Sequence, residues 1–285
     1  YHTVYALLGV AAATVANRPG AHELLETMLQ EQKDYWIDDY GLVWDQYDEA
    51  FTEPVPVHAL GTLIHTIEAY MAAAEATTEP EWLDRAEKMT AFAYKVASKN
   101  NWRIPEYYDE EWQPSLEAGK LCNDGRRYHE GYVTGHSMQL ARFALQVRAG
   151  LRSTGWAVPD YLMELGTELF ERARVDGWRR TDGAPGFSTA VNDQGDPVPG
   201  EDEHQQWVVC EGVCATVAVR RAMLDDGHRI DEVEHFEHCY RSFVDYIHDY
   251  LIAQPGRWIR RLGPHNESVQ PAKSSRWDVY HAIQA

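Results

Sequence analysis

The sequence of 285 residues has little that would place it among secreted or membrane proteins. It contains only four cysteines, which form neither a CxxC pair nor the spacing of a secreted disulfide framework. No apolar run reaches the roughly 20 residues that cross a bilayer, and no signal peptide is visible. These absences favour reduced thiols and a cytoplasmic protein.

Linker-like stretches and positive charge are also scarce. No segment is rich in Gly and Ser or in Pro, and a hydrophobic content of 44% is enough for a large core, so we expect a single domain over residues 1–285. Lys and Arg number 26 against 45 Asp and Glu, which gives a formal charge of -19. This charge repels phosphate and anionic lipid, so the sequence predicts no nucleic-acid and no membrane partner. A neutral small molecule is a better candidate for the ligand of so acidic a protein. Assembly into a homo-oligomer is also possible.

A short pattern that opens with histidine recurs along the chain. It reads HTVYA at His2, HTIEA at His65, HSMQLA at His136 and HAIQA at His281, each with a hydrogen-bonding side chain three residues after the histidine. A further copy, VVCEGVCA, begins at position 208 and keeps the polar residue as Glu211 without the histidine. From position 2, the intervals to 65, 136, 208 and 281 are 63, 71, 72 and 73, which indicates an internal repeat. We therefore expect each repeat to offer polar side chains to a common centre.

Two kinds of helix alternate between these copies. Short helices that are apolar nearly all round, and therefore surrounded by protein, are expected at 4–15, 59–76, 135–149 and 208–223, with another starting at 279. Amphipathic helices with one wet face are expected at 22–37, 81–97, 161–175 and 232–247. An inner helix, an outer helix and a period of about seventy residues are typical of a helical hairpin array. Closed into a toroid, such an array surrounds a pocket with its inner helix ends.

The long connections at 99–132 and 175–206 interrupt this array. Connections of that length in a compact domain are usually functional. Within the second one, the NDQG run at Asn192 lies between GFSTAV and DPV and predicts the turn of a small β-hairpin, which we expect beside the pocket mouth.

Successive blocks of the chain resemble the N-acylglucosamine 2-epimerase superfamily. The blocks are HTIEAYMAAAEATTEPEWLDRAEKM, IPEYYDEEWQP, GYVTGHSMQLARFAL, GFSTAVNDQGDPVPGEDEHQQWVVCEG and WDVYHAIQA. The likeness is strongest to the aldose-ketose isomerase branch, which contains mannose isomerases and sulfoquinovose isomerase. It implies an all-α fold, the (α/α)6 barrel, here without its first three helices. It also implies the interconversion of sugars at C1 and C2 with no metal and no organic cofactor.

The resemblance implies that His136 and His281 are the acid/base residues. Imidazole suits this role because proton transfer between C1 and C2 through an enediol needs a group that is partly free base near neutral pH and can return the proton. A lone histidine on an apolar helix is more often a satisfied core residue. The repeated helical position and the two family blocks favour the catalytic interpretation.

Further residues are placed at the sugar site by the same resemblance. His65 matches a histidine that contacts the sugar, and Arg126 an arginine at the pocket rim, for which a solvated loop charge is the alternative. Tyr1 is expected at the pocket end of the first helix, either as part of the pocket wall or as a frayed terminus. Glu211 matches a carboxylate of the fourth inner helix. A carboxylate in an apolar helix is costly unless it is partnered, so we expect Glu211 to accept hydrogen bonds from a histidine or from sugar hydroxyls.

The chain departs from the family pattern three residues after His136. The usual glutamate is replaced by Gln139, which hydrogen-bonds but holds no charge. This substitution leaves an inactive sugar-binding homologue as one alternative. The sequence alone also does not decide between isomerisation and 2-epimerisation, or which sugar is used.

Two other classes of enzyme remain to be weighed. The histidines and Glu211 are candidate metal ligands, but they lie in separate repeats with no HxxxH pair, which is a weak motif. A toroid glycoside hydrolase needs two carboxylates across a bond, for which Glu68 and Glu211 are candidates, and it leaves the histidine pattern unexplained. A cofactor-independent isomerase of a mannose-like monosaccharide accounts for more of the sequence.

Overall fold

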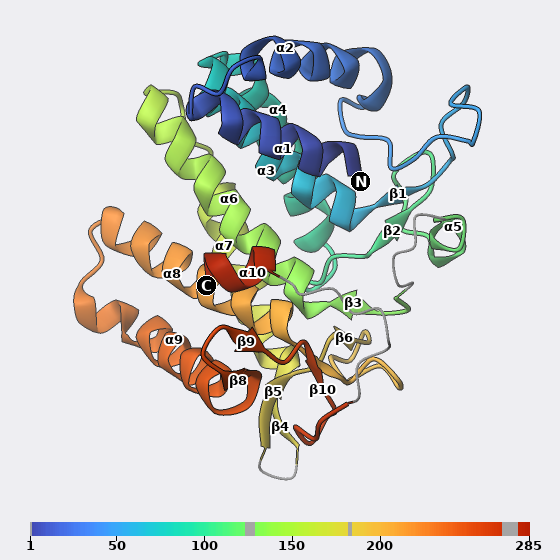
Figure 1. The fold of residues 1–285 in the computed structure, drawn as a ribbon. Coiled ribbons are helices and arrows are strands. Elements are labelled where there is room, and N and C mark those ends of the chain that lie inside the picture. The colour runs from blue at the N-terminus through green and yellow to red at the C-terminus, as the bar shows by residue number, and fades with distance from the viewer. Residues whose placement is uncertain (1, 123–128, 182–183, 270–278) are drawn as a thin grey trace. The chain divides into compact units, whose positions relative to one another are not determined.

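Helices dominate the structure, which is a computed structural model describing residues 2–122, 129–181, 184–269 and 279–285. The helices are α1 (His2–Val15), α2 (Ala21–Glu31), α3 (Leu60–Thr77), α4 (Pro80–Ala97), α5 (Leu116–Gly119), α6 (Thr134–Thr154), α7 (Tyr161–Gly177), α8 (Gln206–Asp225), α9 (Glu234–Tyr246) and α10 (Val279–Gln284) (Figure 1). The strands are β1 (His58–Ala59), β2 (Tyr107–Tyr108), β3 (Tyr132–Val133), β4 (Trp178–Thr181), β5 (Ala184–Phe187), β6 (Ala190–Val191), β7 (His204–Gln205), β8 (Ile252–Gln254), β9 (Arg257–Trp258) and β10 (Arg261–Leu262). Among the described residues, no helix is long and apolar enough to cross a membrane.

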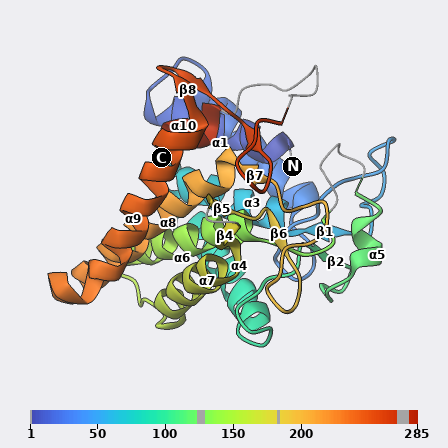
Figure 2. The ribbon, with the colours of Figure 1, turned by 90° about the horizontal axis from the view of Figure 1, so that it is seen from below.

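The chain forms two compact units. The first contains residues 1–96, 105–128 and 147–162, and the second contains residues 97–104, 129–146 and 163–285. In the first unit α1 packs against α2 and α3, and in the second α8 packs against α9 and α10. Figure 2 shows α8 and α9 side by side from a second direction. The single-domain organisation stays a prediction.

The inner helices are buried as their apolar sequences predict. In α3 and α8 most side chains of the first three turns are inaccessible, including the polar ones, and Met138 to Leu145 of α6 are buried without a break. The first helix differs, because only Val4, Leu7 and Ala11 of α1 are buried and Ala6, Gly9 and Ala12 are exposed. Its apolar residues therefore pack on one side only, contrary to our expectation of a helix surrounded by protein. The short α10 has no buried residue.

The outer helices bury one stripe each. In α9 the buried residues are Phe236, Cys239, Phe243 and Tyr246, which follow the three-to-four-residue period of an amphipathic helix. Both α2 and α9 continue into a π-helical turn, at Gln32–Trp36 and Ile247–Leu251. The sequences there, DYWI and DYLI, repeat at equivalent places. The alternation of inner and outer helices is thus confirmed with small shifts at the ends.

Short strands connect the helices in a repeating order. A two-residue strand precedes each of α3, α6 and α8, and it pairs with a strand that follows the next outer helix along the chain. The antiparallel pairs are β1 with β2, β3 with β6, and β7 with β10. Because each pair fixes the residues just before an inner helix, it sets the position at which that helix begins.

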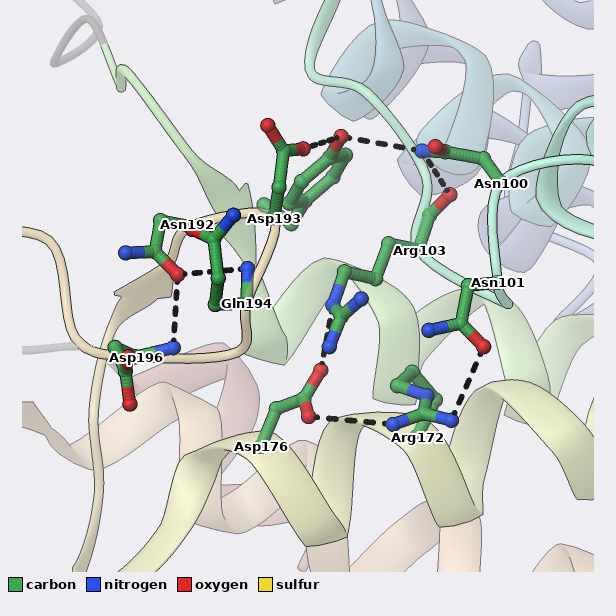
Figure 3. A network of polar contacts seen from close by, with 10 residues as sticks. Asn100, Asn101, Arg103, Arg172, Asp176, Asn192, Asp193, Gln194 and Asp196 are labelled. Carbon is green, nitrogen blue, oxygen red and sulfur yellow. Dashed lines mark hydrogen bonds and ion pairs between the residues drawn. The ribbon is translucent and has the colours of Figure 1, made fainter.

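The predicted NDQG hairpin is confirmed. The side-chain oxygen of Asn192 accepts hydrogen bonds from the backbone N–H groups of Gln194 and Asp196, both at 2.9 Å, and Val191 bridges Pro197 (Figure 3). Gly195 has φ 82°, a left-handed conformation that glycine adopts without strain. A β-carbon there would also lie 2.5 Å from an Asp176 carboxylate oxygen, so the turn needs glycine for two reasons.

A buried ion pair lies beside this turn. The Arg103 guanidinium donates to the Asp176 carboxylate at 2.7 Å, and both side chains are less than one-tenth exposed. In Figure 3, Arg172 reaches the same carboxylate. The Tyr132 hydroxyl donates to Asp193 at 2.6 Å and accepts a hydrogen bond from Asn100. Tyr132 opens β3, so this network holds the strand that leads into α6.

Removing one member of this pair should destabilise the protein strongly. We expect Asp176→Asn to lower the free energy of unfolding by about 3–5 kcal/mol, because it removes the carboxylate charge that compensates the buried Arg103 guanidinium. The matched control is Asp84→Asn, which breaks the exposed pair with Lys88 at 2.7 Å and should cost less than about 1 kcal/mol. Urea unfolding of the three proteins measures both values, and equal losses would contradict the prediction.

A buried histidine in the first unit is held between two indole rings. The His58 ring is stacked against Trp112 at 4.0 Å and against Trp44 at 4.7 Å between centroids. Its Nδ1–H donates to the Val43 carbonyl at 2.9 Å, and Nε2 is buried with no hydrogen-bond partner among the described residues. Burial lowers the pKa of His58 below its ordinary 6.5, and the Val43 carbonyl and the charge of Asp38 oppose this without cancelling it.

The lowered pKa of His58 makes stability fall in acid. The unfolded chain takes up the proton at about pH 6.5 and the folded one only at lower pH, so the contribution of His58 is complete above pH 6.5 and is lost as pH falls toward its folded pKa. One such group gives a slope of at most about 1.4 kcal/mol per pH unit. We expect His58→Phe, which keeps the stacking, to flatten the decline in urea-unfolding free energy between pH 7 and 5. The exposed His22→Phe should leave the decline unchanged.

Candidate functional site

Glu211 is the centre of a buried polar cluster in the second unit. Its carboxylate accepts two hydrogen bonds from the Arg142 guanidinium, at 3.0 and 3.1 Å, and one from the Gln139 amide at 3.3 Å. The Nε2 of His281 lies 3.6 Å from the same carboxylate oxygen that Gln139 contacts. Glu211 and Gln139 are 1% exposed and Arg142 is 6% exposed. The cluster is therefore shielded from bulk water, which strengthens its electrostatic contacts.

The surrounding elements place each member of this cluster. Gln139 and Arg142 are three residues apart on α6 and therefore share one face. Glu211 lies on α8, whose start is fixed by β7 pairing with β10 and by the Gln206 N–H donating to the Arg260 carbonyl at 2.9 Å. His281 comes from α10, which packs on α8. The Cys214 thiol donates to the Gln284 carbonyl at 3.3 Å and ties the two helices together.

His136 reaches this cluster through an aromatic contact. Its ring lies 5.3 Å from the Trp207 ring, and the His281 ring lies 5.7 Å from the same indole. His136 is half-buried in the first turn of α6. That turn is anchored by Thr134, whose hydroxyl donates to the Ser188 carbonyl at 2.7 Å and whose N–H donates to the Thr189 carbonyl at 3.0 Å. Both predicted acid/base histidines thus contact one indole.

The glycine before His136 is required by this indole. A β-carbon at Gly135 would lie 2.3 Å from the nearest carbon of the Trp207 ring. We expect Gly135→Ala to lower the unfolding free energy by about 1–3 kcal/mol through overpacking, which outweighs the gain of up to about 1 kcal/mol from higher helix propensity.

A second substitution separates overpacking from other causes. Trp207→Leu removes the ring that the new β-carbon would strike, so Gly135→Ala should be nearly neutral when made in that background. A double-mutant cycle of urea unfolding measures the coupling, which we expect to exceed about 0.5 kcal/mol. Additive losses would show that the contact with Trp207 is not the reason for the glycine.

The first unit contains a separate histidine arrangement around His65. The side chain of Glu68 lies 3.1 Å from Nδ1, and the Tyr5 hydroxyl lies 2.8 Å from Nε2. Because a carboxylate only accepts, Nδ1 carries the proton, and in the neutral ring Nε2 accepts from Tyr5. His65 is 4% exposed. This histidine is held in one tautomer, and its meeting with the cluster of the second unit stays a prediction.

The structure places some of the predicted site residues and not others. The second unit brings together His136, Gln139, Glu211 and His281, whereas Tyr1 and Arg126 lie outside the described residues. The predicted partners of Glu211 were a histidine or sugar hydroxyls. The structure adds two donors, Arg142 and Gln139, because a fork-shaped guanidinium satisfies both carboxylate oxygens at once. The expected histidine is present as His281, whose Nε2 lies 3.6 Å from the carboxylate.

Two residues of the cluster were missed by the sequence analysis, Arg142 and Trp207. The position of Arg142, three residues after Gln139 on an otherwise apolar helix, was a usable signal, because a buried arginine needs a buried acid. Trp207 comes just before the copy of the repeat that contains Glu211, but no periodicity identifies it as a neighbour of both histidines.

Comparison with known proteins identifies the family. A model of N-acylglucosamine 2-epimerase (GlcNAc 2-epimerase) matches residues 1–285. The chain is 31% identical over 295 residues to a D-mannose isomerase of Thermobifida fusca and 30% identical over 289 residues to a D-mannose isomerase of Pseudomonas cannabina pv. alisalensis. Both alignments cover 100% of this chain and 67% of the relative. The chain belongs to the N-acylglucosamine 2-epimerase family.

Solved structures show the fold of this family member. A crystal structure of a D-mannose isomerase matches it with a TM-score of 0.79 at 20% identity, covering 93% of this chain and 64% of the other. A cellobiose 2-epimerase from Spirochaeta thermophila matches with a TM-score of 0.72 at 16% identity, covering 94% of this chain and 63% of the other. The predicted fold class, an all-α fold of the (α/α)6 type with few small strands, is confirmed. The names of the relatives agree with the predicted sugar isomerase or epimerase activity.

The chain spans about two thirds of the length of the relatives it matches. Their names refer to those whole proteins.

Proposed function

We propose that this protein interconverts a mannose-like aldose with the corresponding ketose by histidine acid/base catalysis through an enediol, with no metal or organic cofactor. The observation that carries the proposal is the position of His136 and His281 against one indole, with His281 beside the buried carboxylate of Glu211. Two relatives named D-mannose isomerase, each about as similar to this chain as the other, support the choice of sugar.

The proposed reaction moves protons only. One imidazole removes the proton from C2 of the open-chain aldose while the carbonyl oxygen at C1 gains a proton, which gives the enediol. The hydroxyl at C2 then loses its proton as C1 is protonated, and the ketose results. A second imidazole carries the proton between the two oxygens. We assign these two tasks jointly to His136 and His281, and we assign sugar binding to His65, Gln139, Glu211, Arg126 and Tyr1.

Epimerisation at C2 is the second candidate. It uses the same deprotonated intermediate and returns the proton to the opposite face of C2, so the same two histidines serve it. The likeness to a cellobiose 2-epimerase structure and the family itself favour keeping it. A glycoside hydrolase is less well supported, because the carboxylate of Glu211 is engaged by Arg142 at both oxygens and is suited to accepting hydrogen bonds rather than to donating a proton.

A product analysis tests the proposal. The protein is incubated with D-mannose, with and without a chelator, and fructose and glucose are quantified by chromatography. Fructose formed at the same rate in both samples supports the isomerase, and glucose in place of fructose supports the epimerase. No conversion of mannose would refute the proposed substrate, and loss of fructose formation in chelator would refute the cofactor-independent mechanism.

The remaining expectations about the whole protein rest on its sequence. We expect a cytoplasmic location because the four cysteines form neither a CxxC pair nor a secreted spacing, and we expect no nucleic-acid partner because of the charge of -19. A homo-oligomeric state stays open and is measured directly by sedimentation.

A further inference from the structure

The buried cluster in the second unit holds balanced charge. Glu211 contributes one negative charge and Arg142 one positive charge, and their two hydrogen bonds at 3.0 and 3.1 Å form a fork. The third partner of the carboxylate, Gln139, is neutral. A buried charge is tolerated when it is paired in this way, and an additional unpaired one is expensive.

Gln139 and His281 both lie close to the same carboxylate oxygen of Glu211. The amide of Gln139 donates to Glu211 Oε1 at 3.3 Å, and His281 Nε2 lies 3.6 Å from that atom. A glutamate in place of Gln139 has no proton to donate when ionised, so it would put a second carboxylate against the first. Like charges at this distance do not both stay ionised without a counter-charge. His281, whose Nε2 lies 3.6 Å from Glu211 Oε1, gains a positive charge by taking up a proton.

Other titratable groups also lie around His281. Among the described residues they include the Cys214 thiol of α8, Tyr280 of its own helix, and His136 across the Trp207 ring. Burial raises the pKa of Cys214 to about 11, so its thiol carries no charge near neutral pH. The carboxylate of Glu211, 3.6 Å from His281 Nε2, is the acidic group that an added charge at position 139 would join.

We propose that Gln139 and Arg142 are positioning residues that limit the cluster beside His281 to one compensated carboxylate. This inference rests on the proposed function in one respect only: the proposed function gives the proton of His281 a catalytic role. It assigns a role to the glutamine that replaces the usual glutamate and to an arginine that touches no reacting atom. In this cluster the Glu211–Arg142 pair is already neutral, so a neutral side chain at position 139 keeps the charges equal. We therefore interpret Gln139 as a functional substitution and not only as the loss of a carboxylate.

Histidine NMR tests the proposal without reference to activity. The His281 signal of protein labelled with ¹³C at histidine Cε1, identified by its loss in His281→Gln, is titrated in the unsubstituted protein and in Gln139→Glu. We expect the proton affinity of His281 to rise at least about tenfold in Gln139→Glu, because a carboxylate this near shifts a pKa by about one unit or more. The neutral control Gln139→Met should change it by less than about threefold.

A double variant keeps the test valid if Gln139→Glu folds poorly. Gln139→Glu with Glu211→Gln moves the single carboxylate to position 139 and keeps the number of charges, so the proton affinity of His281 should return to within about threefold of the unsubstituted value. An unchanged affinity in Gln139→Glu, or an equal rise in Gln139→Met, would overturn the proposal.

The pH dependence of kcat/KM links this cluster to the reaction. In Gln139→Glu the acid limb should move to higher pH by the amount that the NMR titration gives, while the limb of Gln139→Met stays in place. A shifted His281 titration in a protein that converts no mannose would refute the proposed function and leave the charge balance intact. If Gln139→Glu converts mannose but its His281 titration is not shifted, the charge-balance inference is refuted and the proposed function stands.

Discussion

We expect His136→Ala and His281→Ala each to lower kcat for mannose by about 10²–10⁴-fold, which is the usual contribution of a positioned acid/base group. Sugar binding should change far less, because the lost interaction is made mainly in the transition state. The measurement is the initial rate of fructose formation over a range of mannose concentrations, with binding followed separately by calorimetry.

The control for these variants is His235→Ala. His235 lies on the outer helix α9 and pairs with Glu171 at 2.7 Å on the surface, so its loss should change kcat by less than about twofold. A thermal unfolding curve for each variant separates loss of chemistry from loss of fold. If either His136→Ala or His281→Ala keeps most of kcat and loses binding instead, that histidine is a sugar ligand and not an acid/base group.

The double variant distinguishes two ways in which the histidines share the reaction. If both act on one proton path, His136→Ala/His281→Ala should be hardly slower than the slower single variant, because groups that act as a unit are strongly non-additive. Multiplied losses would mean that they act in separate steps. Their contact with the same Trp207 ring favours the first result.

The helical layers could be predicted from the sequence because burial leaves a direct pattern. The period of Phe236, Cys239 and Phe243 identifies one buried stripe of α9, and the apolar run of α8 identifies a helix with no wet face. The first helix shows the limit of this reasoning. An apolar sequence shows that a helix can be buried, but other parts of the fold decide whether it is. In α1 the buried residues lie on one side of the helix.

The candidate site was only partly predictable for a similar reason. The repeat identified His136, Gln139, Glu211 and His281 because equal positions in equivalent repeats reach equal depth. Arg142 belongs to the same face of α6, but a repeat of histidines contains no information about the cation that balances Glu211. Contacts of this kind depend on side-chain geometry across helices and not on spacing within one.

Solvent deuterium provides the sharpest test of the proposed chemistry. When the reaction runs in deuterated water, we expect deuterium at C1 of the fructose formed from mannose, because an imidazole that holds the proton exchanges it with solvent before returning it. Product recovered early in the reaction is analysed by mass spectrometry and NMR. The label should be absent from the sugar in the His136→Ala/His281→Ala double variant over the same period.

The opposite result has an equally definite meaning. A hydride that shifts directly between C2 and C1 never meets solvent, so it leaves no deuterium at C1. Unlabelled fructose together with inhibition by chelator would replace the enediol mechanism with a metal-assisted hydride shift. Label at C2 of recovered mannose, or of glucose, would instead show that the proton is removed as proposed and returned to the same carbon. In that case His136 and His281 would serve a 2-epimerase, and the structural argument for their shared action on one sugar would stand.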